Sequence, residues 1–155
     1  MIDHLIPGGI AALSMARLGC LFDGCDFGRL TDGGLSVVYG NATRAWEVHV
    51  VEYGLSPVSP ISYAVHPFAA YLALWGLVAA LVGEVWRRKR EAAGSAAVVS
   101  ALVFLLGGGF IEWLREPLTV VPIGESMTVY PFVYTVAALG VAAVWRFGLR
   151  GSSDG

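Results

Sequence analysis

Long apolar runs without a charged side chain dominate the chain. Such runs lie at residues 67–83 (PFAAYLALWGLVAALVG), 95–111 (SAAVVSALVFLLGGGFI) and 126–145 (SMTVYPFVYTVAALGVAAVW). A weaker run at 5–22 is interrupted by a proline, two glycines and Arg17. About 20 residues of helix cross a hydrocarbon core of ~30 Å. The pattern therefore predicts an all-α integral membrane protein with about four transmembrane helices, at approximately 5–22, 66–86, 95–114 and 126–146.

The composition favours a bilayer as the solvent of these runs. Of the 155 residues, 56% are hydrophobic and 14% are charged, and the mean hydropathy is +0.67. In soluble domains, charged residues make up roughly a quarter of the sequence. Buried helices of a soluble core are the alternative, but so many uncharged runs in so short a chain speak against it. The length fits a single membrane domain over residues 1–155, and the net charge of −2 gives no indication of a nucleic-acid partner.

The N-terminal sequence does not resemble a secretory signal. The opening residues MIDH lack the positive charge with which such signals begin. The stretch RLGC at 17–20 places an arginine where a lipoprotein processing site has an aliphatic residue. We therefore expect the first apolar run to be a membrane helix.

Basic residues gather on one side of the predicted spans. RRKR at 87–90 follows the second span, and Arg146 and Arg150 follow the fourth, so six of the ten Lys and Arg residues share one side. An excess of Lys and Arg marks the cytoplasmic side. We therefore expect the loop 87–94 to be cytoplasmic and the long loop 23–65 to face the periplasm or the cell exterior. The expected location is the inner membrane of a bacterium.

Several ionisable residues meet at the outer membrane boundary in this arrangement. They are Arg17, Arg29, His66, Glu112, Arg115 and Glu116. An arginine inside a span is costly unless it is paired or hydrated, and its planar fork binds phosphate oxygens in pairs. We therefore predict a site for the phosphate of a phospholipid headgroup, formed by arginines from different helices.

Simpler interpretations stay open for individual residues. Arg115 could extend alone to the headgroup region, or pair with Glu112 three residues before it. Arg17 could belong to a buried structural pair, and His66 could be an ordinary residue at a helix start. The segment 23–28 is expected to be a structured turn, and the glycines at 107–109 favour close helix packing.

The two cysteines lie five residues apart, which is neither one helix face nor a redox motif. We expect Cys20 and Cys25 to be reduced, half-buried thiols. A local disulfide is the first alternative, and a zinc site that also uses His66 and an aspartate is the second.

ARLGCLFDGCDFGRLTD (16–32) and three later stretches carry recognisable motifs. Together, and in this order, they resemble the prolipoprotein diacylglyceryl transferase family, and the first is similar to the family's signature segment. GLSPVSPISYAVHP (54–67) resembles the segment leading into its H-P-T-Q-L-Y-E element, and GGGFIEWLREP (107–117) resembles the element that ends in E-x-x-R-x-P. GESMTVYPFVY (124–134) is similar to its L-S-M-x-Q stretch. The signature positions matched are Arg17, Gly19, Gly24, Gly28, Arg29 and Thr31.

The resemblance implies a polytopic inner-membrane enzyme whose site faces the periplasm, in agreement with the orientation derived from the basic residues. Such enzymes move the diacylglyceryl group of phosphatidylglycerol to a prolipoprotein cysteine thiol, forming a thioether and releasing glycerol phosphate. The expected partners are phosphatidylglycerol or another anionic phospholipid, a lipoprotein precursor peptide and the membrane. No cofactor or metal is expected.

The expected site residues follow by position. Arg17 and Arg115 match the arginines that hold the phosphate and the leaving glycerol phosphate, and His66 is the expected base for the incoming thiol. The expected catalytic residues are therefore Arg17, His66 and Arg115. The expected headgroup-binding residues are Arg17, Asp23, Gly28, Arg29, Glu112 and Arg115.

The chain also departs from the family pattern. Family members begin with about three further spans and a histidine-glycine-glycine segment, which we expect this chain to lack, and His4 lies on the wrong side to replace that histidine. The segment HPFAAYLAL keeps His66, Pro67 and Tyr71 but not the Gln and Glu of the family element, and Gly108 stands where the family has an early arginine.

These departures leave three hypotheses. The first is an abbreviated transferase. The second is a non-catalytic phospholipid- or lipoprotein-binding relative, or a subunit of a split enzyme. The third is a redox protein that uses Cys20 and Cys25. Because four spans enclose little space, the first two predict a homo-oligomer or a partner subunit.

Overall fold

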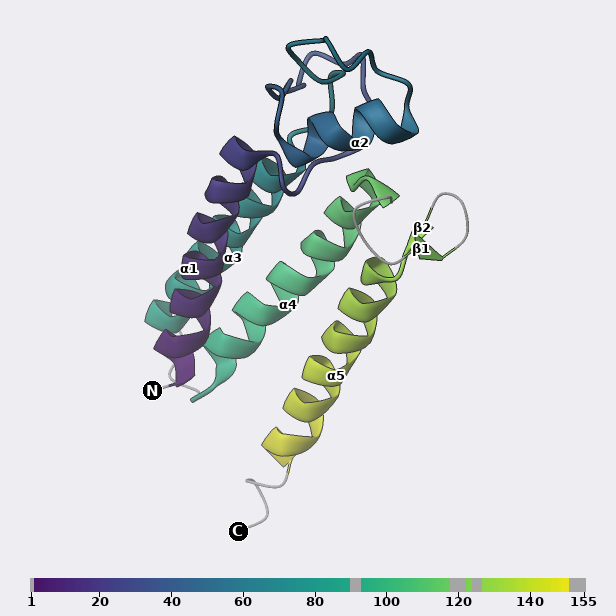
Figure 1. Cartoon of the computed structure of the whole chain (residues 1–155). Helices are drawn as coiled ribbons and strands as arrows, with labels where there is room; N and C mark the ends of the chain where they lie inside the picture. The colour runs from purple at the N-terminus through teal and green to yellow at the C-terminus, as the bar shows by residue number, and fades with distance from the viewer. Residues whose placement is uncertain (1, 90–92, 118–121, 124–126, 151–155) are drawn as a thin grey trace. The chain divides into compact units, whose positions relative to one another are not determined.

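The computed structural model describes residues 2–89, 93–117, 122–123 and 127–150 (Figure 1). Its helices are α1 (Ile2–Asp23), α2 (Arg44–Glu52), α3 (Phe68–Lys89), α4 (Ser95–Ile111), the 3₁₀ turn η1 (Glu112–Leu114) and α5 (Tyr130–Arg150). The strands β1 (Pro122–Ile123) and β2 (Met127–Thr128) form an antiparallel pair. Parts of the predicted connections, at 90–92, 118–121 and 124–126, lie outside the described residues, as does the tail from 151.

Three helical stretches are long and apolar enough to cross a membrane. They are α1, α3 and Ser95–Leu114, which joins α4 and η1. The prediction of an all-α membrane protein is confirmed to this extent. The predicted fourth span overlaps α5, which begins at Tyr130 rather than at 126; Pro131 suits the first turn of a helix. That α5 crosses a membrane, and that the loop before α3 faces outward, stay predictions.

The chain divides into two compact units. We call residues 1–14, 74–110 and 130–155 the helix unit, and residues 15–73 and 111–129 the loop unit. The boundaries fall within α1 and α3 and near the end of α4. Each unit has its own packing, and each is described in turn.

Small residues let the helices of the helix unit approach closely. A Cβ atom added at Gly107 would overlap the indole ring of Trp75, and one added at Gly108 would lie 2.7 Å from the Tyr134 ring. The indole is fixed there because its Nε1 donates a hydrogen bond to the carbonyl of Val103 at 2.9 Å. The interpretation of these glycines as close-packing positions is therefore confirmed.

Asp3 connects two helices of the helix unit. Its Oδ2 accepts a hydrogen bond from the backbone N of Gly94 at 2.6 Å, and its Oδ1 accepts one from Ala97 at 3.0 Å. The first N–H groups of a helix have no partner within the helix and favour a carboxylate. Asp3, near the start of α1, thus caps the beginning of α4.

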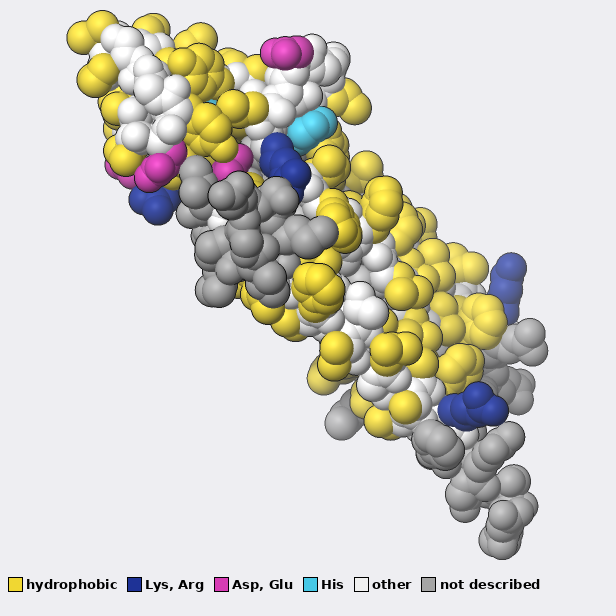
Figure 2. Space-filling model, turned by 90° about the vertical axis from the view of Figure 1, so that its right-hand side faces the viewer, with side chains coloured by type: hydrophobic (Ala, Val, Ile, Leu, Met, Phe, Trp, Pro, Cys, Tyr) yellow, Lys and Arg dark blue, Asp and Glu magenta, His cyan; other side chains and the backbone are white. Residues whose placement is uncertain are grey.

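Large apolar side chains are exposed on the helix unit. More than 60% of the surface is accessible for Leu5, Leu13, Leu74, Leu81, Leu106, Phe110 and Leu139. Figure 2 shows a face of the molecule on which hydrophobic side chains are abundant and charged ones are few. Apolar surface of this extent is unusual in water and is what a helix facing lipid presents.

The loop unit has a small core of its own. Its members are Phe27, Tyr39, Ala45, Val48 and Val65. Val37 and Val65 exchange backbone hydrogen bonds at 2.9 and 3.0 Å. The side chain of Thr43 caps α2 by accepting from the backbone N of Trp46. The segment between α1 and α3 is therefore a folded element with a helix of its own.

Candidate functional site

The signature segment turns sharply after α1. Gly24 adopts a left-handed backbone conformation (φ +64°), which favours glycine, and its N donates to the carbonyl of Cys20 at 3.0 Å. The turn places Cys25 beside Cys20, with their Cα atoms 5.1 Å apart, and the two residues form a disulfide. The prediction of two reduced thiols is wrong, because the tight turn at Gly24 brings the two cysteines within bonding reach of each other.

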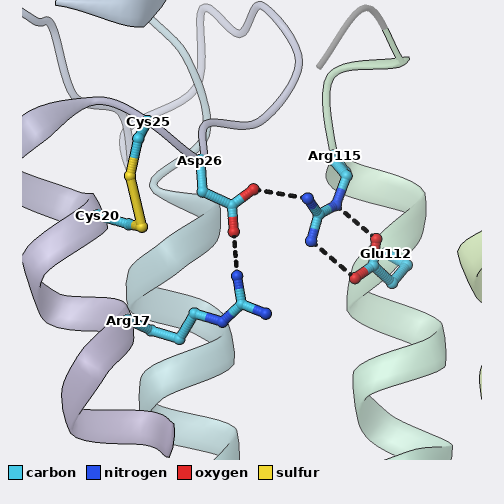
Figure 3. Close-up of polar contacts among 6 residues, drawn as sticks. All are labelled: Arg17, Cys20, Cys25, Asp26, Glu112 and Arg115. Carbon is cyan, nitrogen blue, oxygen red and sulfur yellow. Dashed lines mark hydrogen bonds and ion pairs between the residues drawn. A yellow bond between two sulfur atoms is a disulfide. The ribbon is translucent and has the colours of Figure 1, made fainter. Parts of the chain in front are cut away.

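Asp26 follows this turn and joins two arginines (Figure 3). Its Oδ2 accepts a hydrogen bond from Nη1 of Arg17 at 2.6 Å, and its Oδ1 accepts one from Nη1 of Arg115 at 2.7 Å. The residue is 5% exposed. A single buried carboxylate therefore bridges the end of α1 and the segment after η1, which lie far apart in the sequence.

The guanidinium of Arg115 is fully engaged within the protein. Nε and Nη2 grip the two carboxylate oxygens of Glu112 at 2.6 and 3.0 Å, while Nη1 bonds to Asp26. The group also lies 4.4 Å from the centre of the Phe68 ring, a favourable cation–π contact. Arg115 is 7% and Glu112 1% exposed. The pairing of Arg115 with Glu112, one of the two simpler interpretations, is thus present.

Arg17, unlike Arg115, is partly exposed and makes fewer contacts with described residues. Its side chain is 39% exposed and its one ion pair among the described residues is with Asp26. Its Nε and Nη2 atoms form no hydrogen bond with another described residue. An arginine with one nitrogen anchored and an accessible edge can bind a further anion.

Backbone hydrogen bonds hold three segments around these side chains. The N of Gly28 donates to the carbonyl of His66 at 3.1 Å, and the N of His66 donates to Arg29 at 3.0 Å. The N of Arg29 donates to the carbonyl of Leu114 at 2.8 Å. A Cβ atom at residue 28 would lie 2.7 Å from both the His66 Cβ and the Leu114 carbonyl. Only glycine fits this crossing.

The remaining polar groups of the site lie beside this crossing. The Nε of Arg29 donates to the carbonyl of Arg115 at 3.4 Å, and Nδ1 of His66 lies 3.4 Å from the Tyr71 hydroxyl. Glu116 is buried, and its N donates to the carbonyl of Phe27 at 3.2 Å. The six residues predicted to converge are therefore brought together within the loop unit.

Asp23 is the predicted site residue that the structure leaves apart. It is exposed at the end of α1 and has no ion pair with a described residue. Asp26, three positions later, is the carboxylate that contacts Arg17 and Arg115. Its signal in the sequence is an acidic residue next to a cysteine within a glycine turn, but the spacing alone does not distinguish it from Asp23.

Two ionisable side chains in the core of the loop unit were also missed. Burial lowers the pKa of His49, and the ring lies edge-on to Phe27 with Nδ1 accepting from the backbone N of Tyr63 at 3.1 Å. Burial raises the pKa of Tyr39, and the carboxylate of Asp26 raises it further. No group of three metal-binding side chains occurs among the residues that the structure describes.

The chain has recognisable relatives. Residues 1–146 match the sequence model of a family described as prolipoprotein diacylglyceryl transferase. The phosphatidylglycerol–prolipoprotein diacylglyceryl transferase of Gloeobacter violaceus is 28% identical over 153 residues, which cover 97% of this chain and 52% of the relative. The protein of the same name from Clostridium tetani is 24% identical over 115 residues, covering 74% of this chain and 41% of the relative.

A third relative is similar over a shorter stretch. The phosphatidylglycerol–prolipoprotein diacylglyceryl transferase of Dehalococcoides mccartyi is 31% identical over 65 residues, covering 42% of this chain and 23% of the relative. The chain thus spans about half of the length of these curated relatives or less. No solved structure matches it significantly.

Proposed function

Because the chain belongs to the prolipoprotein diacylglyceryl transferase family, we propose that it acts on phosphatidylglycerol and a lipoprotein precursor. In this proposal Arg17 binds the phosphate of the lipid, and the diacylglyceryl group passes to a cysteine thiol of the precursor. The two molecules are those in the names of the relatives.

The observation that carries the proposal is the arrangement of Arg17. It is anchored by Asp26 through one nitrogen and is 39% exposed, with no other ion pair in the described part of the chain. A guanidinium in this state offers paired donors to phosphate oxygens. Its position near the end of α1, one of the helices able to cross a membrane, suits the depth of a headgroup.

The proposed reaction needs a base and a stabilised leaving group. The thiol loses its proton, its sulfur bonds to the glyceryl carbon, and the bond from that carbon to the phosphate oxygen breaks as glycerol phosphate leaves. A thiol with an ordinary pKa near ~8.5 is mostly protonated at neutral pH. His66, half-buried and tied to Gly28 and Arg29 by backbone hydrogen bonds, is the proposed base. Arg17 stabilises the charge on the leaving phosphate.

The proposed setting is the inner membrane of a bacterium. The chain forms one membrane domain, with α5 as a fourth span and the loop unit on the periplasmic side. The positions of the basic residues in the last turn of α3 and in α5 support this orientation.

A transfer assay tests the proposal. The full chain in phosphatidylglycerol liposomes is mixed with a peptide that contains a lipoprotein-type cysteine, and the peptide mass is followed. We expect a diacylglyceryl mass gain that Arg17→Ala abolishes and the matched control Arg44→Ala leaves intact, because Arg44 is exposed and its partner is Glu47. A gain that persists in Arg17→Ala would refute the role of Arg17. Arg17-dependent phosphatidylglycerol binding without any gain would reduce the function to lipid binding.

A further inference from the structure

We propose that Asp26 is a positioning residue which aims one edge of Arg17 at a phosphate. Asp26 holds Nη1 of Arg17, so that the Nε and Nη2 atoms form a paired donor for the phosphate of an anionic lipid. The inference rests on the proposed function, since it assigns the way in which the same site binds its lipid.

The argument begins with the two arginines, which use Asp26 in the same way. Each donates its Nη1 to one oxygen of the carboxylate, Arg17 at 2.6 Å and Arg115 at 2.7 Å. Nε and Nη2 of a guanidinium lie on the same edge and donate in parallel, which suits two oxygens of one anion. In both residues, therefore, the edge formed by Nε and Nη2 takes no part in the hydrogen bond to Asp26.

In Arg115 the paired edge already holds an anion. Its Nε and Nη2 bond to the two oxygens of the Glu112 carboxylate at 2.6 and 3.0 Å. In Arg17 the same edge meets no carboxylate of a described residue. The Arg115–Glu112 pair therefore indicates, within this protein, how a phosphate would lie on Arg17.

Asp26 can direct Arg17 because Asp26 is itself fixed. It is buried, and its second oxygen is bound to Arg115, which Glu112 and the Phe68 ring hold in turn. Along the chain, Asp26 directly follows Cys25, whose disulfide ties the turn to α1. Cys20 lies three residues after Arg17, and residues at this spacing share a helix face. The disulfide and the arginine therefore belong to one face of α1.

A double-mutant cycle tests the coupling. The full chain in phosphatidylcholine nanodiscs is titrated with short-chain phosphatidylglycerol, and the dissociation constant is measured by calorimetry. We expect Asp26→Asn to weaken binding about tenfold, the size of one charge-assisted hydrogen bond. We expect the double variant Arg17→Ala/Asp26→Asn to bind as Arg17→Ala does, because Asp26 acts through Arg17. Effects that add in the double variant would overturn the proposal.

Two further variants separate positioning from folding. Asp32→Asn, a change of the same kind at an exposed residue later in the same segment, should bind as the wild type does. Arg17→Lys keeps the charge on a partly exposed side chain but lacks the paired edge, so we expect about a tenfold loss. Wild-type affinity in Arg17→Lys would overturn the proposal even if Asp26→Asn failed to fold.

The same titration distinguishes the inference from the function on which it rests. If Arg17→Ala binds phosphatidylglycerol as well as the wild type does, the proposed function fails, and the inference fails with it. If Arg17→Ala weakens binding while Asp26→Asn does not, the inference alone fails.

Discussion

The helix unit and the loop unit are held together by different kinds of contact. In the helix unit, glycines and serines on apolar helices allow close approach, as where Gly107 faces Trp75. In the loop unit, a carboxylate and two arginines link segments that are far apart in the sequence, and a disulfide closes the turn after α1. The first kind consists of many small dispersion terms, whereas the second concentrates its energy in a few charged groups.

The difference shows where each unit is vulnerable. Adding a methyl group at a glycine where two helices pack closely disturbs the local fit, and the helices can shift slightly to accommodate the group. Losing one buried charge leaves its partners desolvated without compensation, which no small shift repairs. The loop unit should therefore respond more strongly to single substitutions, and mainly at charged positions.

The largest effect is expected for Arg115→Met. The substitution keeps much of the side-chain volume but leaves Asp26 and Glu112 buried without this cation, which we expect to destabilise the loop unit by about 3–5 kcal/mol. Hydrogen–deuterium exchange of the protein in nanodiscs, resolved by peptide, measures the effect in each unit. Arg44→Met is the control, because its exposed pair with Glu47 is worth less than ~1 kcal/mol. Unchanged exchange in the loop unit of Arg115→Met would contradict the expectation that this unit is the more sensitive to loss of a buried charge.

The disulfide comes next. Replacing Cys20 and Cys25 by serine opens a short loop, and chain entropy gives an expected loss of about 2 kcal/mol in the loop unit. The loss should appear as faster exchange in residues 24–31, with exchange of α5 peptides unchanged. Equal acceleration in both units would mean that the bridge stabilises the whole chain rather than this turn.

An effect of about the same size is expected in the helix unit from Gly107→Ala. The new methyl group must displace the Trp75 indole, which we expect to cost about 1–3 kcal/mol. Gly140→Ala in α5 is the matched control, since nothing lies within 4 Å of a Cβ atom there; it should be neutral or slightly stabilising. Thermal unfolding in nanodiscs compares the two, and a similar midpoint for both would contradict close packing at residue 107.

The smallest effect at neutral pH concerns His49. Because burial lowers its pKa in the folded state, the unfolded chain binds the proton first as the pH falls through ~6.5. The stability of the loop unit should therefore decrease below that pH, by less than about 1 kcal/mol between pH 7 and pH 6. Exchange of α2 peptides across this range measures the slope. His49→Gln keeps a hydrogen-bond acceptor without titrating, so an equal slope in this variant would exclude His49 as the source.

Much of the architecture could be predicted from local patterns. The runs at 67–83 and 95–111 correspond to α3 and α4, because a helix that faces lipid is apolar on all sides and this is visible in the sequence. The convergence of Arg17 and Arg115 also followed, since counting spans places both at one membrane boundary. The contact of Asp26 with both arginines could not be predicted from the sequence. Asp23 and Asp26 lie in the same acidic turn, and only the structure shows which of the two side chains is buried.

The sequence by itself thus determined the apolar helices, the turn after α1 and the residue types available at the site, because each depends on a few neighbouring positions. Only the tertiary structure decided which carboxylate joins the arginines, that Cys20 and Cys25 are bonded, and that Glu112 occupies Arg115 while Arg17 keeps an accessible edge. The physical reason is distance along the chain. Residues 26 and 115 meet through backbone hydrogen bonds among three segments, and no local pattern specifies that meeting.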